Sequence, residues 1–245
     1  MILSGHQPEY LPYLGFIYKI AKADLFILVD HVQYLEKSFQ NSNRIRTAPG
    51  LNGFTWLTVP VISRGRRFQK ICEVEIDNSA AWGKKHWKTI YLNYKNTKHF
   101  AEHQEFFEKI YAKKWEKLAE LTETMIYYLV EQLGIKTPIV KSSDYDFKEK
   151  KNDLLIEMCQ RLKADAYLSG SGVRNYVDEG KDDKGPAKTY VDEEKIKRNG
   201  LNHIFSDFKH PVYPQKYKPF VPHLSVIDLL FNCGPKSLDI ILNKN

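Results

Sequence analysis

The first thirty residues constrain the fold more than any other part of the chain. A short apolar start at Ile2 and Leu3 runs into a polar loop, and residues 14–23 then carry apolar side chains at helical spacing. The apolar segment 24–30 follows and predicts a second buried strand. A strand, a loop, a helix and a strand in this order predict the opening βαβ unit of a parallel α/β sheet.

The polar loop of this unit is where we expect a small-molecule site. Ligands bind at the carboxyl ends of the strands in open parallel sheets, and this loop carries His6, Gln7 and Tyr10. His6 is the candidate general base, because the ordinary pKa of histidine lies near neutral pH. Asp30, at the end of the second strand, is the candidate carboxylate that would orient it. Gln7 and Tyr10 are candidate substrate contacts.

Each of these side chains also has a structural alternative. His6 could hydrogen-bond the backbone and stiffen its loop, and Gln7 could cap the following helix. Tyr10 could line a ligand site or fill the core. Asp30 could form a turn at the end of its strand.

Further apolar segments extend the predicted sheet. Strand patterns occur at residues 54–62, 71–76, 137–142, 166–169 and 201–208. Residues 151–162 place their apolar side chains on one face and predict a helix. We therefore expect one α/β domain over residues 1–245, built on a Rossmann-like parallel sheet.

The middle and the end of the chain add helices and an insertion. Residues 80–133 are rich in aromatics and mostly helical in pattern, which predicts a helical subdomain. Residues 177–189 are charged and contain glycine, which predicts an exposed insertion. Ser225 is the expected N-cap of a late helix. Asp228 lies within that apolar helix, where an unpaired carboxylate would be costly, so we expect it to be paired.

The densest polar cluster of the chain lies just after the second strand. It holds four candidate substrate-binding side chains: Gln40, Asn41, Asn43 and Arg44. Amides suit hydroxyl-rich sugars, and Arg44 offers a planar fork for a phosphate or a carboxylate. A merely solvated loop rarely carries so many amides and so few lysines. Gln33 and Tyr34 precede the cluster and would line the same crevice.

A second candidate ligand loop follows the strand at residues 166–169. Ser169, Gly170 and Ser171 could present backbone N–H groups to an anion. The spacing matches neither G-x-G-x-x-G nor a P-loop, so it does not predict nucleotide binding. Nothing supports Ser171 as a nucleophile, because a G-x-S-x-G turn is absent. The basic turn at residues 63–67 could meet a pyrophosphate or an anionic membrane, although such turns are commonly just solvated.

Composition narrows the expected partners. Thirty-seven Lys and Arg face 30 Asp and Glu along the chain, giving a net charge of +7. This balance favours an anionic small molecule over nucleic acid, and it leaves peripheral contact with an anionic membrane open. No apolar run approaches the roughly 20 residues that span a bilayer. The three cysteines are widely spaced, with no metal-binding pattern, and fit a cytoplasmic protein.

Eight blocks of sequence, taken in order, resemble the WbqC-like family. They lie at residues 6–12, 15–24, 30–34, 40–45, 57–61, 167–170, 210–215 and 224–232. The chain departs from the family pattern at Ser42-Asn43, where the family usually has Asn-Arg-Asn. It also carries about 14 extra residues near the charged insertion, so either Tyr176 or Tyr190 matches the family position.

The resemblance implies a role in bacterial surface-polysaccharide or O-antigen synthesis. The role suggested for the family is the transfer of a small acyl group, glycine being one proposal, onto a sugar. We therefore expect a cytoplasmic acyl or aminoacyl transferase that acts on a sugar or a nucleotide sugar. His6 would deprotonate the acceptor with Asp30 orienting it, while Arg44 and the neighbouring amides would hold the anionic end of the donor.

Two other classes of protein stay open. Nucleotidyltransferase-like enzymes begin with the same order of elements and use ATP, but their H-x-G-H pair is missing, since Glu9 stands where the second histidine belongs. A non-catalytic glycan-assembly protein would use the amides and aromatics for binding alone. The sequence names neither a donor nor a cofactor; an acyl donor and ATP are the candidates.

Overall fold

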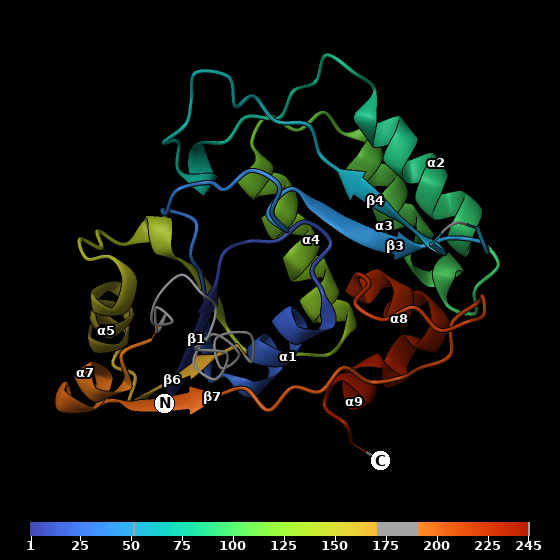
Figure 1. Cartoon of the computed structure of the whole chain (residues 1–245). Helices are drawn as coiled ribbons and strands as arrows, with labels where there is room; N and C mark the ends of the chain where they lie inside the picture. The colour runs from blue at the N-terminus through green and yellow to red at the C-terminus, as the bar shows by residue number, and fades with distance from the viewer. Residues whose placement is uncertain (51, 171–190, 245) are drawn as a thin grey trace, which may run out of the picture. The chain divides into compact units, whose positions relative to one another are not determined.

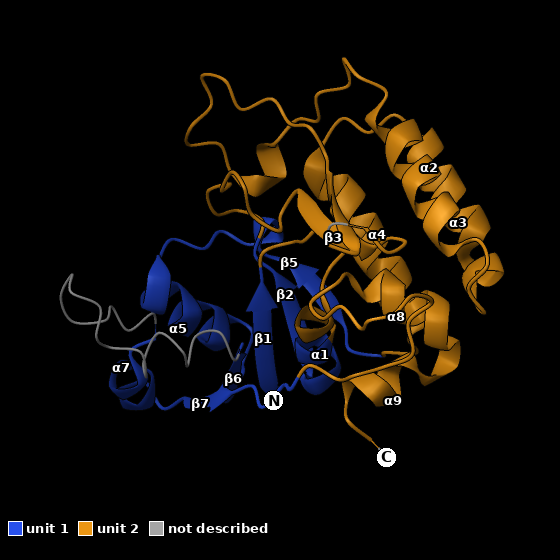
Figure 2. Cartoon of the chain, turned by 45° about the vertical axis from the view of Figure 1, so that its right-hand side comes forward, with its two compact units in different colours: residues 1–6, 18–29, 136–209 blue, residues 7–17, 30–135, 210–245 orange. Residues whose placement is uncertain are grey.

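The computed structural model describes residues 1–50, 52–170 and 191–244 (Figure 1). Its contacts divide the chain into two compact units, shown in blue and orange in Figure 2. Unit 1 comprises residues 1–6, 18–29 and 136–209, and unit 2 comprises residues 7–17, 30–135 and 210–245. The insertion predicted at residues 177–189 lies outside the described residues, as do Ser171, Tyr176 and Tyr190.

Unit 1 is built on a five-stranded parallel sheet. Its strands are β1 (Ile2–His6), β2 (Leu25–Leu28), β5 (Ile139–Lys141), β6 (Ala166–Ser169) and β7 (Asn202–Phe205). They lie in the order β5-β2-β1-β6-β7, and every neighbouring pair is parallel. The chain therefore changes direction across the sheet between β1 and β6, which is the switch point where such folds bind ligands. The predicted α/β fold with a Rossmann-like parallel sheet is confirmed.

Helices connect these strands. They are α1 (Leu14–Lys22), α5 (Lys151–Arg161) and α7 (Glu193–Arg198), with a short 3-10 turn, η2 (Ser142–Asp144), after β5. The parallel pairing of β1 with β2 across α1 confirms the predicted βαβ opening. None of the described helices is both long and apolar enough to cross a membrane.

Gly5 lets the central strand pack closely. A Cβ at this position would lie 2.9 Å from Cγ2 of Ile27 and 3.1 Å from the hydroxyl of Tyr167. Both neighbours come from strands adjacent to β1. The absent side chain thus makes room for the large Tyr167 ring, which is buried beside β1.

Unit 2 combines a small antiparallel sheet with helices. Its regular elements are β3 (Ser42–Arg46), β4 (Phe54–Thr58), η1 (Ile71–Glu73), α2 (Trp82–Tyr94), α3 (Phe100–Ala112), α4 (Leu118–Gln132), α8 (Val226–Cys233), η3 (Gly234–Lys236) and α9 (Ser237–Ile241). The helical pattern predicted for residues 80–133 is confirmed as α2, α3 and α4. Ser225 caps α8 by accepting the backbone N–H of Ile227, also as predicted.

Two segments of unit 2 differ from the sequence prediction. The strand predicted at residues 71–76 is wrong, because the segment begins with η1, where the Lys70 N–H donates to the Glu73 carboxylate at 2.8 Å. Its buried residues Ile71 and Val74 are three positions apart, which is the spacing of a helical turn, whereas Val74 and Ile76 have the two-residue spacing of a strand. The polar stretch before β4 forms β3, which pairs with β4 and ends at the fully buried Arg46.

Replacing Gly83 by alanine is expected to destabilise unit 2 by about 1–3 kcal/mol, because it overpacks the contact between α2 and α3. A Cβ on Gly83 would lie 2.5 Å from the carbonyl oxygen of Tyr111, and a backbone atom cannot move aside cheaply. Urea unfolding measures the change. Gly50→Ala is the control, because its Cβ would meet nothing closer than 3.9 Å. Equal stability of the two variants would contradict the prediction.

Candidate functional site

The carboxyl ends of β1 and β6 bring predicted site residues together in unit 1. His6 is the last residue of β1, and Ser169 is the last residue of β6, with Gly170 directly after it. The two strands are parallel neighbours, so these residues lie at the same edge of the sheet. His6 is partly exposed, whereas Ser169 is buried. This edge is the switch point of the sheet and therefore the best-placed ligand site of unit 1.

Lys19 adds a buried cation to this edge. Its side chain is only 3% exposed, and Nζ donates a 2.9 Å hydrogen bond to the carbonyl oxygen of Gly5. Nζ also lies 6.0 Å from the centre of the Phe26 ring. A Cβ on Gly170 would lie 3.9 Å from Cδ of Lys19, which places the lysine stem beside the predicted glycine loop.

Lys19 was not among the residues predicted from the sequence, although a signal for it exists. It follows the buried Phe16 by three positions and precedes the buried Ala23 by four. A residue at those spacings shares the apolar face of the helix. A lysine on such a face is rarely buried unless polar groups meet its ammonium, because a charge is costly to remove from water.

The second catalytic candidate, Asp30, belongs to unit 2. It follows β2 by two residues and is 2% exposed, and its carbonyl oxygen accepts the N–H of Cys72. Its predicted role in orienting His6 stays a prediction.

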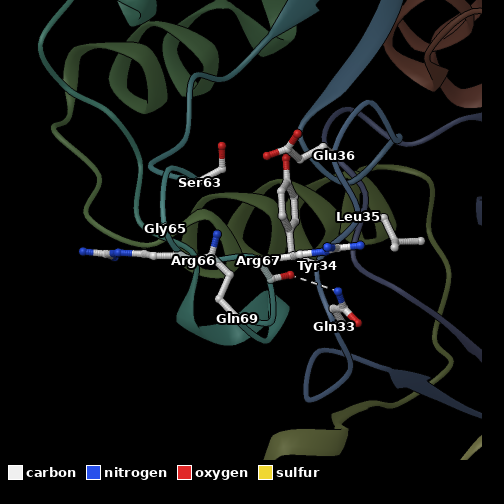
Figure 3. Close-up of a pocket in the computed structure, with 9 residues that line it drawn as sticks. All are labelled: Gln33, Tyr34, Leu35, Glu36, Ser63, Gly65, Arg66, Arg67 and Gln69. Atoms are coloured by element: carbon white, nitrogen blue, oxygen red, sulfur yellow. Dashed lines mark hydrogen bonds between the residues drawn. The ribbon is translucent and has the colours of Figure 1, made fainter.

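Gln33 and Tyr34 line a cavity of about 420 Å³ in unit 2 (Figure 3). The basic turn at residues 63–67 and Gln69 also line it. Nε2 of Gln33 donates to the carbonyl oxygen of Arg67 at 2.9 Å. The backbone N–H of Tyr34 donates to the carbonyl oxygen of Gln69. Burial and the nearby Glu36 carboxylate raise the pKa of Tyr34 to about 12. The segment around Gln33 and the basic turn, which are separate features of the sequence, thus line one cavity.

The charges at this cavity are largely balanced. Arg66 forms a 2.9 Å ion pair with Glu75, which also lies 3.4 Å from Nζ of Lys117. The Arg66 guanidinium lowers the pKa of the Glu75 carboxyl. Glu36 contributes a further negative charge to the cavity wall, and Arg67 a positive one. A polar ligand fits this cavity better than a pyrophosphate, which would need uncompensated cations.

The amide cluster is extensively hydrogen-bonded within unit 2. Nε2 of Gln40 donates to Oε1 of Gln7 at 2.7 Å, while Oε1 of Gln40 accepts the N–H of Leu35. Nδ2 of Asn41 donates to the carbonyl oxygen of Val59 at 2.9 Å. These bonds tie the N-terminal loop and β4 to the segment around β3.

Asn43 and Arg44 are similarly engaged. Nδ2 of Asn43 donates to the carbonyl oxygen of Leu11 at 2.6 Å, a residue whose φ is +48°. Nη2 of Arg44 donates to the carbonyl oxygen of His223 at 2.9 Å. The Arg44 guanidinium also lies 4.9 Å and 5.6 Å from the ring centres of Phe54 and Trp56. Both side chains hold unit 2 together, and their substrate roles stay predictions.

Tyr10 is fully buried in unit 2. Its hydroxyl lies 2.8 Å from Nδ1 of His86 and 2.7 Å from the hydroxyl of Tyr111. Burial raises the pKa of Tyr10 and lowers that of His86 to about 4. The Tyr10 hydroxyl is enclosed between His86 and Tyr111, so this geometry favours the core role over the ligand contact.

The parallel sheet and the polar residues at its carboxyl edge define an α/β protein of the Rossmann-like type. The chain belongs to the WbqC-like protein family, whose sequence model matches residues 7–240. It is also 35% identical over 237 residues to a protein of Mycobacterium tuberculosis described as uncharacterized protein Rv1507c, covering 96% of this chain and 95% of that protein. No solved structure gives a significant match.

Proposed function

We propose that the protein is a transferase that moves an acyl or aminoacyl group, glycine being one candidate, onto a sugar or nucleotide sugar for a surface polysaccharide. The observation that carries the proposal is the buried Lys19 ammonium at the switch-point edge of the sheet. A buried cation beside a glycine loop favours an anionic group such as a phosphate or a carboxylate. Membership of the WbqC-like family supports the polysaccharide context.

The residues of this edge fit the steps of such a transfer. Lys19 would hold the anionic end of one substrate, while His6 removes a proton from the attacking amine or hydroxyl of the acceptor. The acceptor then bonds to the acyl carbon, and the donor's leaving group departs. The roles predicted for Asp30 and the Arg44 cluster, which belong to unit 2, stay predictions. The acyl donor is unidentified, and ATP would be needed if the donor is a free amino acid.

Lys19→Met is expected to weaken binding of the anionic substrate about 10- to 100-fold, the equivalent of one charge-assisted hydrogen bond. A thermal-shift screen identifies the ligand first, using nucleotide sugars, acyl-CoA thioesters, glycine and ATP with magnesium. Calorimetric titration of that ligand then compares the variants. Lys22→Met is the matched control, because Lys22 lies on the same helix but is exposed.

Tight binding by Lys19→Met would contradict the proposal. Lys19→Arg keeps the charge and should retain part of the affinity, which separates a lost charge from a disturbed fold. Release of pyrophosphate from ATP without acyl transfer would favour the nucleotidyltransferase alternative. Binding without any turnover would favour the glycan-assembly protein.

A further inference from the structure

A serine and a histidine meet on neighbouring strands of unit 1. Oγ of Ser169 lies 2.7 Å from Nε2 of His203. Ser169 ends β6, and His203 lies on β7 opposite Tyr167 in the parallel register. Side chains two residues apart in a strand share one face of the sheet, so Ser169, Tyr167 and His203 lie on the same face.

The imidazole of His203 is enclosed on this face. Its side chain is 3% exposed, and the Phe205 ring lies 4.4 Å away between centroids. Burial lowers the pKa of His203, while the carboxylate of Glu193 opposes this shift. A ring with a lowered pKa is neutral at neutral pH and can accept a proton through Nε2.

Glu193 occupies the position of an orienting carboxylate. It is the first residue of α7, and its Oε1 lies 4.0 Å from Nδ1 of His203. Within the described part of the chain, Nδ1 has no hydrogen-bond partner. A small adjustment of the exposed Glu193 side chain would close this gap, and hydrogen bonds of catalytic groups often tighten only when substrate binds. A proton held on Nδ1 would leave Nε2 free to accept from Ser169.

Two other buried serines of the unit behave differently. Oγ of Ser4 donates to the carbonyl oxygen of Leu168, and Oγ of Ser206 accepts the backbone N–H of Phe208. In both cases the partner of the serine hydroxyl is a backbone group. Ser169 instead bonds an imidazole at the carboxyl edge of the sheet, where a nucleophile would meet a ligand.

We propose that Ser169, His203 and Glu193 form a nucleophile, base and orienting carboxylate that carry the acyl group as a serine ester. Ser169 Oγ bonds to the carbonyl carbon of an activated acyl donor, an ester or a thioester, and its proton passes to Nε2 of His203. The alcohol or thiol of the donor leaves with that proton. The acceptor's amine or hydroxyl then attacks the ester, gives its proton to His203, and Ser169 recovers it, so that His203 takes the base role that a direct transfer would give to His6. The acyl chemistry rests on the function proposed above; the covalent intermediate is new.

Labelling with a small fluorophosphonate tests the intermediate without any substrate. The reagent bonds to an activated serine oxygen through phosphorus and releases fluoride. We expect one adduct per chain by intact mass, located on Ser169 by peptide mapping of the wild-type protein. His203→Ala should slow labelling at least about 100-fold, the usual contribution of a general base. Ser206→Ala is the matched control and should label at the wild-type rate.

Glu193 acts through His203 and is a positioning residue, so its test uses the pH profile. Its carboxylate raises the pKa of His203, and among the described residues it is the charged group that acts on this ring. Labelling needs neutral His203 and should lose half its rate on acidification through that pKa. Glu193→Gln should move this midpoint to lower pH, a shift that a purely structural role would not produce.

The absence of an adduct, an adduct on another serine, or an unchanged rate in His203→Ala would each overturn the proposal. Peptide mapping uses the wild-type chain, so the result holds even if Ser169→Ala does not fold. The two proposals also fail separately. A labelled Ser169 with no Lys19-dependent ligand would leave the covalent step standing without the sugar substrate. Ligand binding through Lys19 with no labelled serine would leave the function standing without the ester.

Discussion

Asp228→Ala is expected to destabilise unit 2 by about 3–5 kcal/mol, the usual cost of removing one partner from a buried charged network. The Asp228 side chain is fully buried on α8. Oδ1 accepts the hydroxyl of Tyr94 at 2.9 Å. Oδ2 accepts the hydroxyl of Tyr213 and Nε2 of Gln215, both at 3.0 Å. Alanine would leave three buried donors without their acceptor.

The buried Arg46 makes this loss larger. Its backbone N–H donates to the Tyr94 hydroxyl at 2.8 Å, and its Nη2 donates to the carbonyl oxygen of Pro219 at 2.8 Å. Burial raises the pKa of Asp228, and the Arg46 charge opposes this rise, so Arg46 favours the ionised carboxylate. The Arg46 guanidinium donates to the backbone carbonyls of Thr47, Gly53 and Pro219, so Asp228→Ala would remove a negative charge that acts on this buried cation.

Urea unfolding of the variant and of Asp239→Ala measures the effect. Asp239 is an exposed carboxylate on α9 and serves as the control. Asp228→Asn keeps the size and one acceptor oxygen, so it should lie between the wild type and Asp228→Ala. A loss below about 1 kcal/mol in Asp228→Ala would show that the network contributes little beyond an ordinary hydrogen bond.

Acidification from pH 6.5 to 4 is expected to remove up to about 3 kcal/mol of stability through His86, as its pKa shift converts to free energy. Burial, with the nearby Lys85 charge, lowers the pKa of His86 to about 4, against 6.5 for an ordinary histidine. Between pH 6.5 and 4, His86 is therefore protonated in the unfolded chain but neutral in the folded chain. This contribution is complete above pH 6.5 and is lost as the pH falls towards 4. The difference in unfolding free energy between wild type and His86→Asn measures it.

Asp228 provides a control for the pH experiment, because its effect on stability changes with pH in the direction opposite to that of His86. Burial raises the pKa of Asp228 to about 6, against 3.8 for an ordinary aspartate. The folded chain therefore binds this proton more tightly, and the contribution is complete below pH 3.8 and lost as the pH rises through 6. The stability of wild type relative to Asp228→Asn should thus rise on acidification by about 3 kcal/mol. Differences that move in the same direction for both variants would contradict both assignments.

Local patterns predicted the regular elements of unit 1 well. The strand predicted at residues 166–169 has those bounds in the structure, and the predicted helix at residues 151–162 differs from α5 by one residue. Strands buried on both faces are short apolar runs, and a surface helix has a 3.6-residue period, so neighbouring residues suffice to recognise them. The pattern failed at residues 71–76, where a few apolar residues fit two geometries.

The candidate site was only partly visible in the sequence. The strand-end positions of His6 and Ser169 followed from the predicted βαβ order. Lys19 has a helical-face signal, but its contact with Gly5 depends on how α1 lies against β1. His203 had no signal, since its contact with Ser169 requires β7 to lie next to β6, 34 residues away along the chain.

The sequence by itself determined the parallel α/β class, the βαβ opening, most helix ends and the pairing expected of Asp228, because these depend on spacing between near neighbours and on the cost of burying a lone charge. The tertiary structure alone decided strand order, the burial of Arg46 in a polar strand, the meeting of Ser169 with His203, and the engagement of the amide cluster with backbone carbonyls. Those contacts join residues far apart in the chain. Their free energy comes from hydrogen bonds that only the assembled, water-excluding fold can make.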